Sequence, residues 1–89
     1  MEKGYVYILK SGRDSRYYVG STNDVKRRLF QHREGKVYST RRMLPVELIF
    51  TQEFESLSTA RKIEKRIKKF KSRNIIDKII QRGVIELGP

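Results

Sequence analysis

The segment YYVGSTNDVKRRLFQH, residues 17–32, carries several side chains that can move protons or bind anions. Two adjacent tyrosines precede a glycine, and arginines and the chain's one histidine follow it. Phenol and imidazole groups can exchange protons with a substrate, and a guanidinium binds phosphate through charge-assisted hydrogen bonds. A surface hairpin needs none of this chemistry, so the segment is a candidate active-site element.

Arg28 and His32 are four residues apart, which places both on one face of a helix. Val25 and Leu29 share the same spacing and form the adjoining apolar stripe, so Arg28 and His32 should flank the side packed on a sheet. Each residue also has a purely structural interpretation. Arg28 would then be a surface charge, and His32 a residue that favours the helix dipole near the C-terminal end.

Three tyrosines extend this candidate site onto two strands. Tyr5 and Tyr7 lie two residues apart and share one face of the first strand, and Tyr18 lies on the second strand, across a hairpin. Cross-strand packing explains each of them individually.

Glu64 is an acid among apolar positions. On a helix with about 100° per residue it falls between Leu57 and Ala60, inside the arc that should face the core. A buried carboxylate needs a cation or hydrogen bonds. An ion pair with Arg28 would satisfy it, and so would a divalent metal ion, which prefers oxygen ligands.

In this order, these motifs resemble the GIY-YIG nuclease family. Tyr5-Val6-Tyr7 stands at the first triplet and Tyr18-Val19-Gly20 at the second, with Ser21-Thr22, the arginine and the histidine following at the family's spacing. The stretch LSTARKIEKRIKKF resembles the family's glutamate helix. The resemblance covers about residues 4–71 and is greatest to the small stand-alone bacterial branch, whose larger relatives include the N-terminal incision domain of excision repair. Two departures are Tyr5 in place of a glycine and a loosely spaced Asn74, which we leave out of the site.

The resemblance implies a metal-dependent endonuclease that hydrolyses phosphodiester bonds. Tyr7 would be the general base, with Tyr18 ordering water, and the guanidinium of Arg28 would hold the scissile phosphate. A tyrosine with a pKa of about 10 is roughly 0.1% ionised at pH 7. Arg28, His32 if it is protonated, and a nearby metal would in part lower the pKa of Tyr7. Glu64 would bind one Mg²⁺ or Mn²⁺ ion, together with water and the phosphate.

The elements that must position these residues follow from periodicity and turn residues. Strands are predicted at 5–10, 16–19 and 46–54, the first two joined by the turn SGRDSR. A helix capped by Thr22 or Asn23 should run to about Arg33, and residues 35–44 should form a basic loop. Two further helices should follow, capped by Ser56 or Ser58 and by Ser72, the last ending at Gly83. The predicted fold is a single α/β (α+β) sandwich over residues 1–83, order β-β-α-β-α-α. Its three-stranded sheet is mainly antiparallel, and residues 84–89 form a tail.

The charge of the chain predicts a polyanionic partner. Lysine and arginine number 21 against 10 acids, a net charge of +11, and ten of these bases lie between Leu57 and Arg82 with only two acids. Such a surplus favours nucleic acid, and given the resemblance DNA is preferred over RNA. The side chains expected to contact the backbone without reading sequence are Lys36, Arg41, Arg42, Lys68 and Lys71.

The cysteine content and the N-terminal segment bear on the cellular compartment and on alternative functions. The chain has no cysteine, and its N-terminal apolar run of five residues, YVYIL, is too short for a signal peptide or a membrane span, so we expect a cytoplasmic protein. KGYVYI is similar to an aromatic RNA-recognition signature, but that signature belongs to a βαββαβ order. A domain with a nuclease-like fold that only binds nucleic acid is the remaining alternative.

Overall fold

The sheet has the three strands that the sequence predicts, in a computed structural model that describes residues 2–86. Strands β1 (Gly4–Ser11), β2 (Tyr17–Thr22) and β3 (Val46–Phe54) lie in the order β2-β1-β3. Both strand pairs are antiparallel, with Tyr7 opposite Gly20 on β2 and a register shift between Ile8 and Leu9 against β3. The predicted antiparallel sheet is therefore confirmed.

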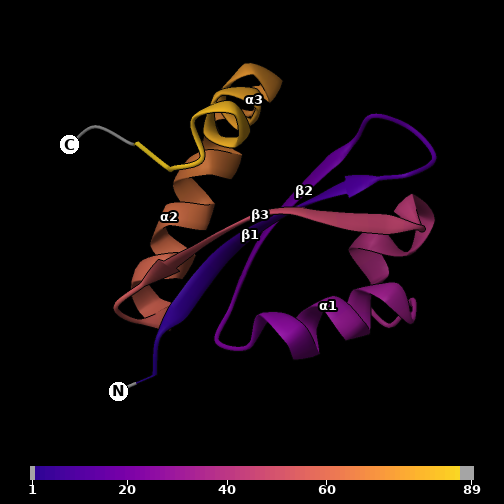
Figure 1. Ribbon diagram of the computed structural model, residues 1–89, viewed down its shortest axis with the longest axis horizontal. Helices are drawn as coiled ribbons and strands as arrows, with labels where there is room; N and C mark the ends of the chain where they lie inside the picture. The colour runs from indigo at the N-terminus through magenta and orange to yellow at the C-terminus, as the bar shows by residue number, and fades with distance from the viewer. Residues whose placement is uncertain (1, 87–89) are drawn as a thin grey trace.

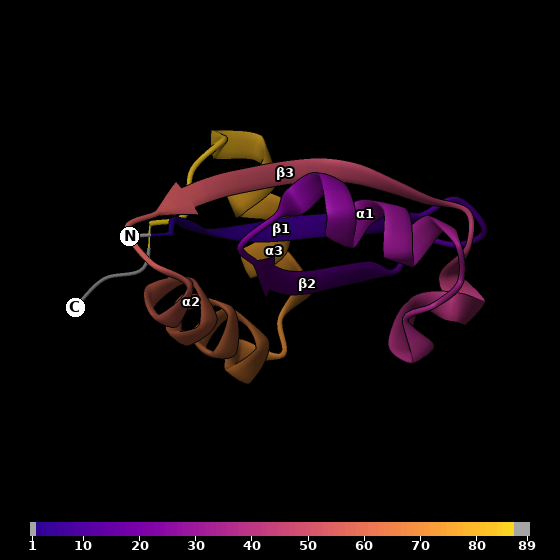
Figure 2. The same ribbon diagram turned by 90° about the horizontal axis from the view of Figure 1, so that it is seen from below.

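Three α-helices cover this sheet on both faces (Figure 1). They are α1 (Val25–Arg33), α2 (Leu57–Phe70) and α3 (Arg73–Arg82), which gives the predicted order β-β-α-β-α-α. In Figure 2, which looks onto one face of the sheet, α1 lies in front of the strands and α3 behind them, so the two helices cover opposite faces. The α+β sandwich is thus confirmed.

The prediction of a loop at 35–44 is wrong in part. A 3₁₀ helix, η1 (Tyr38–Met43), occupies most of this stretch. The side chains of Thr40 and Met43 are buried, at 0% and 4% exposure. Because η1 is only six residues long, its two buried side chains leave no periodic pattern in the sequence.

The first helix begins one residue later than the predicted caps allow. Asp24 is the N-cap, and its side chain accepts a hydrogen bond from Arg27 N at 3.0 Å. The predicted cap Thr22 instead accepts from Asp24 N at 3.1 Å, and Asn23 lies before the cap. The prediction of Thr22 or Asn23 is therefore wrong, because Asp24 competes for the same role with a stronger acceptor.

The ends of the other two helices follow the sequence more closely. Ser56 caps α2 by accepting from Thr59 N at 3.1 Å. Ser72 occupies the N-cap position of α3 without making a side-chain bond there. Gly83 ends α3 at a φ of 74°, a left-handed conformation that glycine adopts at little cost.

Alternate residues of β1 supply two separate cores, one on each face of the sheet. Val6 and Ile8 pack with side chains of α2 and α3, and Tyr7 and Leu9 pack with residues of α1, η1 and β3. Gly4 lets α2 approach β1, since a Cβ there would lie 2.5 Å from Leu57 Cα. The pleat of one central strand therefore sends Tyr7 to the face that α1 covers.

Little of the expected tail at 84–89 lies within the described residues. Within 84–86, Ile85 packs against the core beside α3, and its backbone N–H donates to Gln52 Oε1 at 2.8 Å. Residues 87–89 lie outside the described part of the chain. No helix within residues 2–86 has both the length and the apolar run needed to cross a bilayer.

Candidate active site

The predicted site residues meet at an open edge of the sheet. A cavity of about 310 Å³ lies beside β2, between α1 and α2, and we call it the edge cavity. Tyr7 and Tyr18 reach it from the sheet, Arg28 from α1 and Glu64 from α2. Although α1 and α2 pack on opposite faces, Glu64 lies at the same cavity as Tyr7 and Arg28. The full lining consists of Tyr7, Tyr18, Gly20, Ser21, Arg28, Arg61, Glu64 and Lys65.

Gly20 creates the space in which Tyr7 reaches this edge. Tyr7 and Gly20 are paired across the two strands, and a Cβ on Gly20 would lie 2.5 Å from Cζ and Oη of the Tyr7 ring. Real Cβ atoms do not approach other atoms that closely. The glycine of the YVG triplet is therefore required by the tyrosine of the YVY triplet.

A buried chain of hydrogen bonds fixes the Tyr7 hydroxyl. Its Oη lies 2.7 Å from His32 Nε2, and His32 Nδ1 lies 2.7 Å from Thr40 Oγ1. The Thr40 hydroxyl donates to the Val37 carbonyl at 3.4 Å, so it accepts from His32. His32 then carries its proton on Nδ1, and its free Nε2 accepts the Tyr7 proton.

The pKa of Tyr7 in this chain of hydrogen bonds is raised, whereas the sequence analysis expected it to be lowered. Burial raises the pKa of Tyr7 to about 12, an effect that a hydrogen bond from Arg28 opposes. Burial, together with the charge of Arg28, lowers the pKa of His32 to about 4. His32 is therefore unprotonated in the free protein, and the condition under which it would lower the pKa of Tyr7 is not met there. Both groups are neutral at pH 7, since desolvation disfavours either charge.

Tyr18 lies between the neutral chain and the basic helix. Its ring centroid is 6.3 Å from that of Tyr7 and 5.3 Å from that of His32, the latter in an edge-on arrangement. On the other side, Lys68 Nζ lies 5.0 Å from the Tyr18 ring centroid. Tyr18 therefore contacts His32 and Lys68 as well as Tyr7, its neighbour across the strands.

Among residues 2–86, no carboxylate forms an ion pair with the Arg28 guanidinium. Its Nη1 donates to the side-chain oxygen of Gln31 at 3.0 Å, and it also bonds the Tyr7 hydroxyl. Arg28 and His32 share one face of α1, as their spacing predicts; Arg28 lines the edge cavity, and His32 bonds the hydroxyl of Tyr7, which also lines it. The guanidinium is therefore available to an anion that enters it.

The Glu64 carboxylate is held by neighbours other than Arg28. It accepts a hydrogen bond from the Ser21 hydroxyl and pairs with Lys68 Nζ, one turn later, at 2.7 Å. The Glu64 side chain is 19% exposed and Lys68 46% exposed. Of the two alternatives open from the sequence, the ion pair with Arg28 is thus wrong.

The donor set at Glu64 fits a hydrated divalent ion better than a closed protein cage. Within residues 2–86, no group of three or more His, Cys, Asp or Glu side chains is placed to hold a metal. One carboxylate with the Ser21 hydroxyl beside it leaves most ligand positions to water and phosphate oxygens, a pattern typical of Mg²⁺. The Lys68 ammonium would have to leave the carboxylate first.

Comparison with known proteins agrees with this geometry. Residues 3–77 match the sequence profile described as the GIY-YIG catalytic domain. The chain belongs to the GIY-YIG family. The UPF0213 protein of Streptococcus pneumoniae serotype 4 is 44% identical over 78% of this chain and 70% of its own length. That of Staphylococcus saprophyticus is 36% identical over 93% of this chain and 100% of its own length. The expected kinship with small proteins of this family is confirmed.

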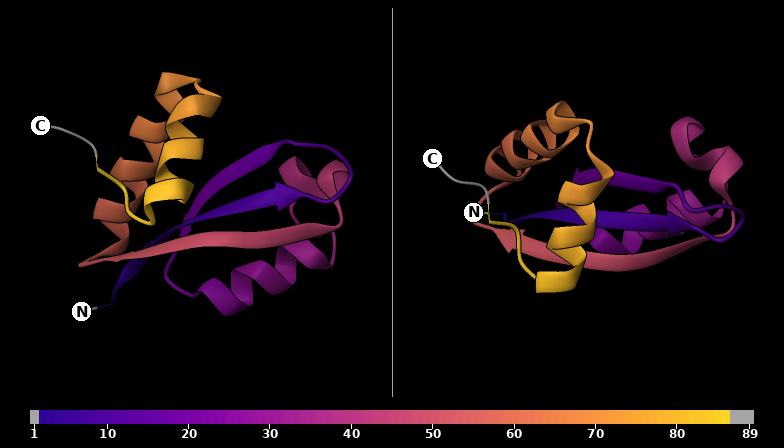
Figure 3. Two further views of the ribbon diagram at one scale, coloured as in Figure 1. Left: turned by 45° about the horizontal axis from the view of Figure 1, so that its top comes forward. Right: turned by 90° about the horizontal axis from the view of Figure 1, so that it is seen from above.

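The predicted nucleic-acid contacts fall into two groups, both beyond the β2 edge. One group is Lys36 and the η1 arginines Arg41 and Arg42; the other is Lys68 in the last turn of α2 and Lys71, the C-cap of that helix. The views from below and above show η1 and α2 both extending past this edge (Figures 2 and 3). Two of these bases rest on rings, Lys36 Nζ 5.8 Å from the Phe30 centroid and Arg41 Cζ 5.7 Å from that of Tyr38.

The sequence prediction omitted three residues that line or support the edge cavity. Arg61 and Lys65 line the edge cavity beside Glu64, and Arg61 stands three residues before it, a helical spacing that could have identified it. Thr40 orients His32, but nothing in the sequence marks it, because its position depends on the path of η1.

Proposed function

We propose that this protein is an endonuclease that hydrolyses phosphodiester bonds in nucleic acid, DNA in preference to RNA, with one divalent metal ion. The observation that carries the proposal is the convergence of two phenols, a guanidinium and a carboxylate on one cavity of about 310 Å³. The edge cavity is open to a polymer at the sheet edge, and the net charge of +11 suits a polyanion.

Glu64 would hold the metal ion, Mg²⁺ or Mn²⁺. When bound, the ion would stabilise the negative charge that develops on the phosphate and leaving oxygens. The Ser21 hydroxyl orients the carboxylate by donating to it. The phosphate and the metal would replace Lys68 together, since the freed ammonium can then pair with a phosphate oxygen.

The Tyr7–His32 pair offers a way to take a proton from water without forming a tyrosinate. With a pKa of about 12, Tyr7 is a poor source of free phenolate. Its oxygen can instead accept a proton from water while its own proton passes to His32 Nε2, 2.7 Å away. A phosphate bound by Arg28 would assist, because it offsets the positive charge that lowers the pKa of His32.

Three cations around the edge cavity would bind the scissile phosphate. Arg28 faces the Tyr7 hydroxyl, and Arg61 and Lys65 line the same space from α2. Charge-assisted hydrogen bonds to phosphate are shorter and stronger than neutral ones. The phosphate would thereby be held beside the phenol that receives the water proton.

The remaining bases would position the polymer on both sides of the cut. The η1 arginines and the α2 lysines carry charge but no base-reading geometry, so sequence specificity should be low. The resemblance to the incision domain of excision repair suggests DNA repair as the process and the cytoplasm as the compartment.

A second candidate is a domain that binds nucleic acid without cutting it. The Glu64–Lys68 pair favours this candidate, because an ammonium occupies the carboxylate that a metal would need. The Lys68 side chain is 46% exposed, so water can reach the ammonium and a metal ion and a phosphate can displace it.

A cleavage assay with a matched pair of variants tests the proposal. Labelled single-stranded, duplex and branched DNA and RNA would be incubated with wild type, Glu64→Gln or Glu47→Gln, with Mn²⁺ or with EDTA. Glu47 is an exposed acid on β3 and serves as the control for the same chemical change. We expect wild type and Glu47→Gln to cut with Mn²⁺ only, and Glu64→Gln to be slower by about 100-fold or more.

Two results would count against the endonuclease. Equal cleavage by Glu64→Gln would indicate a contaminant. Binding by all three proteins without cleavage would favour the binding domain. If about six phosphates are contacted, the logarithm of the binding constant should fall with log salt at a slope near −5.

A further inference from the structure

A second cavity adjoins the edge cavity on the α3 side of Tyr18. It has a volume of about 380 Å³ and lies between β2, α2 and α3, and we call it the α3 cavity. Tyr18 lines both cavities, and Lys68, which lines the α3 cavity, contacts Glu64 of the edge cavity. Anything bound in the α3 cavity would therefore lie next to the scissile phosphate.

The lining of the α3 cavity combines an apolar floor with a basic rim. Ile67, Ile76 and the rings of Tyr17 and Tyr18 form the floor, and cations surround the opening. Its volume falls within the range of about 300–1,000 Å³ of small-molecule sites. An exposed apolar surface surrounded by charges of one sign is typical of a binding site for a ligand of the opposite charge. The rim cations are Arg16, Lys68, Lys71 and Arg73.

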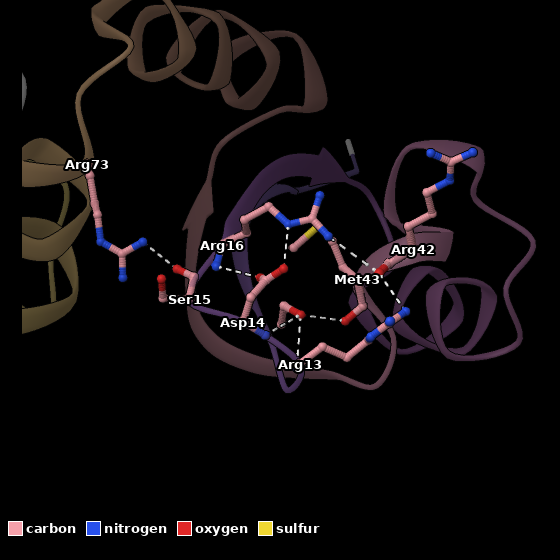
Figure 4. A network of polar contacts seen from close by, with 8 residues as sticks. Arg13, Asp14, Ser15, Arg16, Arg42, Met43 and Arg73 are labelled. Carbon is pink, nitrogen blue, oxygen red and sulfur yellow. Dashed lines mark hydrogen bonds and ion pairs between the residues drawn. The ribbon is translucent and has the colours of Figure 1, made fainter.

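Arg73 is held in place as a flat surface at this opening. Its guanidinium carbon lies 4.4 Å from the Tyr17 ring centroid, and its Nη1 donates to the Ser15 carbonyl of the β1–β2 turn, as Figure 4 shows. Asp77 completes the arrangement, with Oδ2 4.0 Å from Arg73 Nε and Oδ1 accepting from Tyr17 Oη at 2.8 Å. A guanidinium fixed in this way loses little freedom when a planar ligand stacks on it.

We propose that the α3 cavity is a subsite for one unpaired nucleobase next to the scissile phosphate, with the base over the apolar floor and its phosphate on the rim. This inference rests on the proposed function, because it takes the polymer bound at the edge cavity as its occupant. A nucleobase suits the site because it is planar and largely apolar on its faces, yet always attached to a phosphate. A base inside a duplex has both faces stacked, so the subsite selects single-stranded or locally unpaired substrate.

Binding in EDTA separates this subsite from catalysis. A single strand of about ten thymidines would be compared with an abasic strand of the same length, which carries the same phosphates. We expect wild type to bind the thymidine strand about 5- to 100-fold more tightly. Ser72→Trp would fill the α3 cavity, which Ser72 lines without making a capping bond, and should reduce this ratio about 5-fold or more. Ser58→Trp, at an exposed position of α2, should leave it unchanged.

A second pair of variants keeps the test valid if Ser72→Trp does not fold. Arg73→Ala and Arg82→Ala each remove one α3 arginine that has an acid four residues later. Only Arg73→Ala should lower the preference for bases, whereas Arg82→Ala, which removes a charge outside the α3 cavity, should leave that preference unchanged. An unchanged preference in Ser72→Trp or Arg73→Ala would overturn the subsite, as would a wild type that binds both strands equally.

The two proposals fail in different ways. Cleavage by wild type with no preference for bases would leave the endonuclease and remove the subsite. A preference for bases that Ser72→Trp or Arg73→Ala abolishes, without cleavage in Mn²⁺, would leave the subsite and remove the endonuclease.

Discussion

Two groups of residues at the edge cavity differ in charge and in burial. The Tyr7–His32–Thr40 chain, which we call the neutral half, has exposures of 2%, 0% and 0%. The Glu64–Lys68 ion pair, which we call the charged half, has side chains that are 19% and 46% exposed. The neutral half is built into the core of the α1 face, and the charged half is partly open to solvent.

This difference suggests a division of tasks. Buried polar groups must keep their hydrogen bonds, so the Tyr7–His32–Thr40 chain is fixed in position and can transfer a proton along a set path. An ion pair with one solvent-exposed partner can exchange that partner, so the Glu64–Lys68 pair can open for a metal ion and a phosphate. Proton transfer needs fixed geometry, whereas ion and substrate binding need exchange.

The largest expected effect comes from removing the Tyr7 hydroxyl from the neutral half. Tyr7→Phe removes the hydroxyl that links water to His32, and cleavage should slow by about 10²- to 10⁴-fold with the fold retained. Tyr5→Phe is the matched control, because Tyr5 lies on the same strand face and its hydroxyl donates to the exposed Glu53 at 3.3 Å. Single-turnover cleavage rates measure the effect, and a Tyr7→Phe rate equal to that of Tyr5→Phe would exclude the phenol from proton transfer.

A methyl group at position 20 should destabilise the neutral half through a clash with Tyr7. Gly20→Ala puts a Cβ 2.5 Å from the Tyr7 ring, and the free energy of unfolding should fall by about 1–3 kcal/mol. Urea denaturation measures this loss. In a Tyr7→Ala background the same substitution should cost much less, and an equal cost in both backgrounds would show that the two residues do not clash.

The neutrality of His32 should make stability depend on pH. The histidine pKa is about 4 in the folded protein and 6.5 in the unfolded chain, so the unfolded chain binds more protons between these values. Stability should therefore fall as pH drops, by about 2 kcal/mol from pH 7 to pH 5. Urea denaturation of His32→Gln should lack this loss. The same pH dependence in both proteins would show that His32 is not buried in its neutral form.

The smallest expected effect comes from removing the Lys68 ammonium from the charged half. Lys68→Met removes the ammonium that competes with a metal for Glu64, so half-maximal cleavage should need several-fold less Mn²⁺. The free energy of unfolding should change by less than about 0.5 kcal/mol. The salt slope of binding should fall by about 1, as one phosphate contact is lost. Lys69→Met, the exposed neighbour, should leave the metal requirement unchanged, and an unchanged requirement in Lys68→Met would argue against competition.

Local patterns in the sequence carried much of the architecture and the site. Strand alternation predicted that Tyr5 and Tyr7 share a face, and the three-and-four spacing in α2 and α3 predicted their apolar faces. The resemblance of the two triplets, Arg28, His32 and Glu64 to one family predicted that they meet. The cap of α1 was predicted wrongly, since Asp24 and its neighbours Thr22 and Asn23 are all capping residues.

The sequence alone determined which groups are available, because residue type and periodicity are local properties. Only the tertiary structure decided their states. That Glu64 pairs with Lys68 and not with Arg28, that His32 is neutral, and that η1 brings Thr40 to His32 all depend on segments distant in the chain. Burial and electrostatic fields come from every element packed around a group, so no local pattern records them.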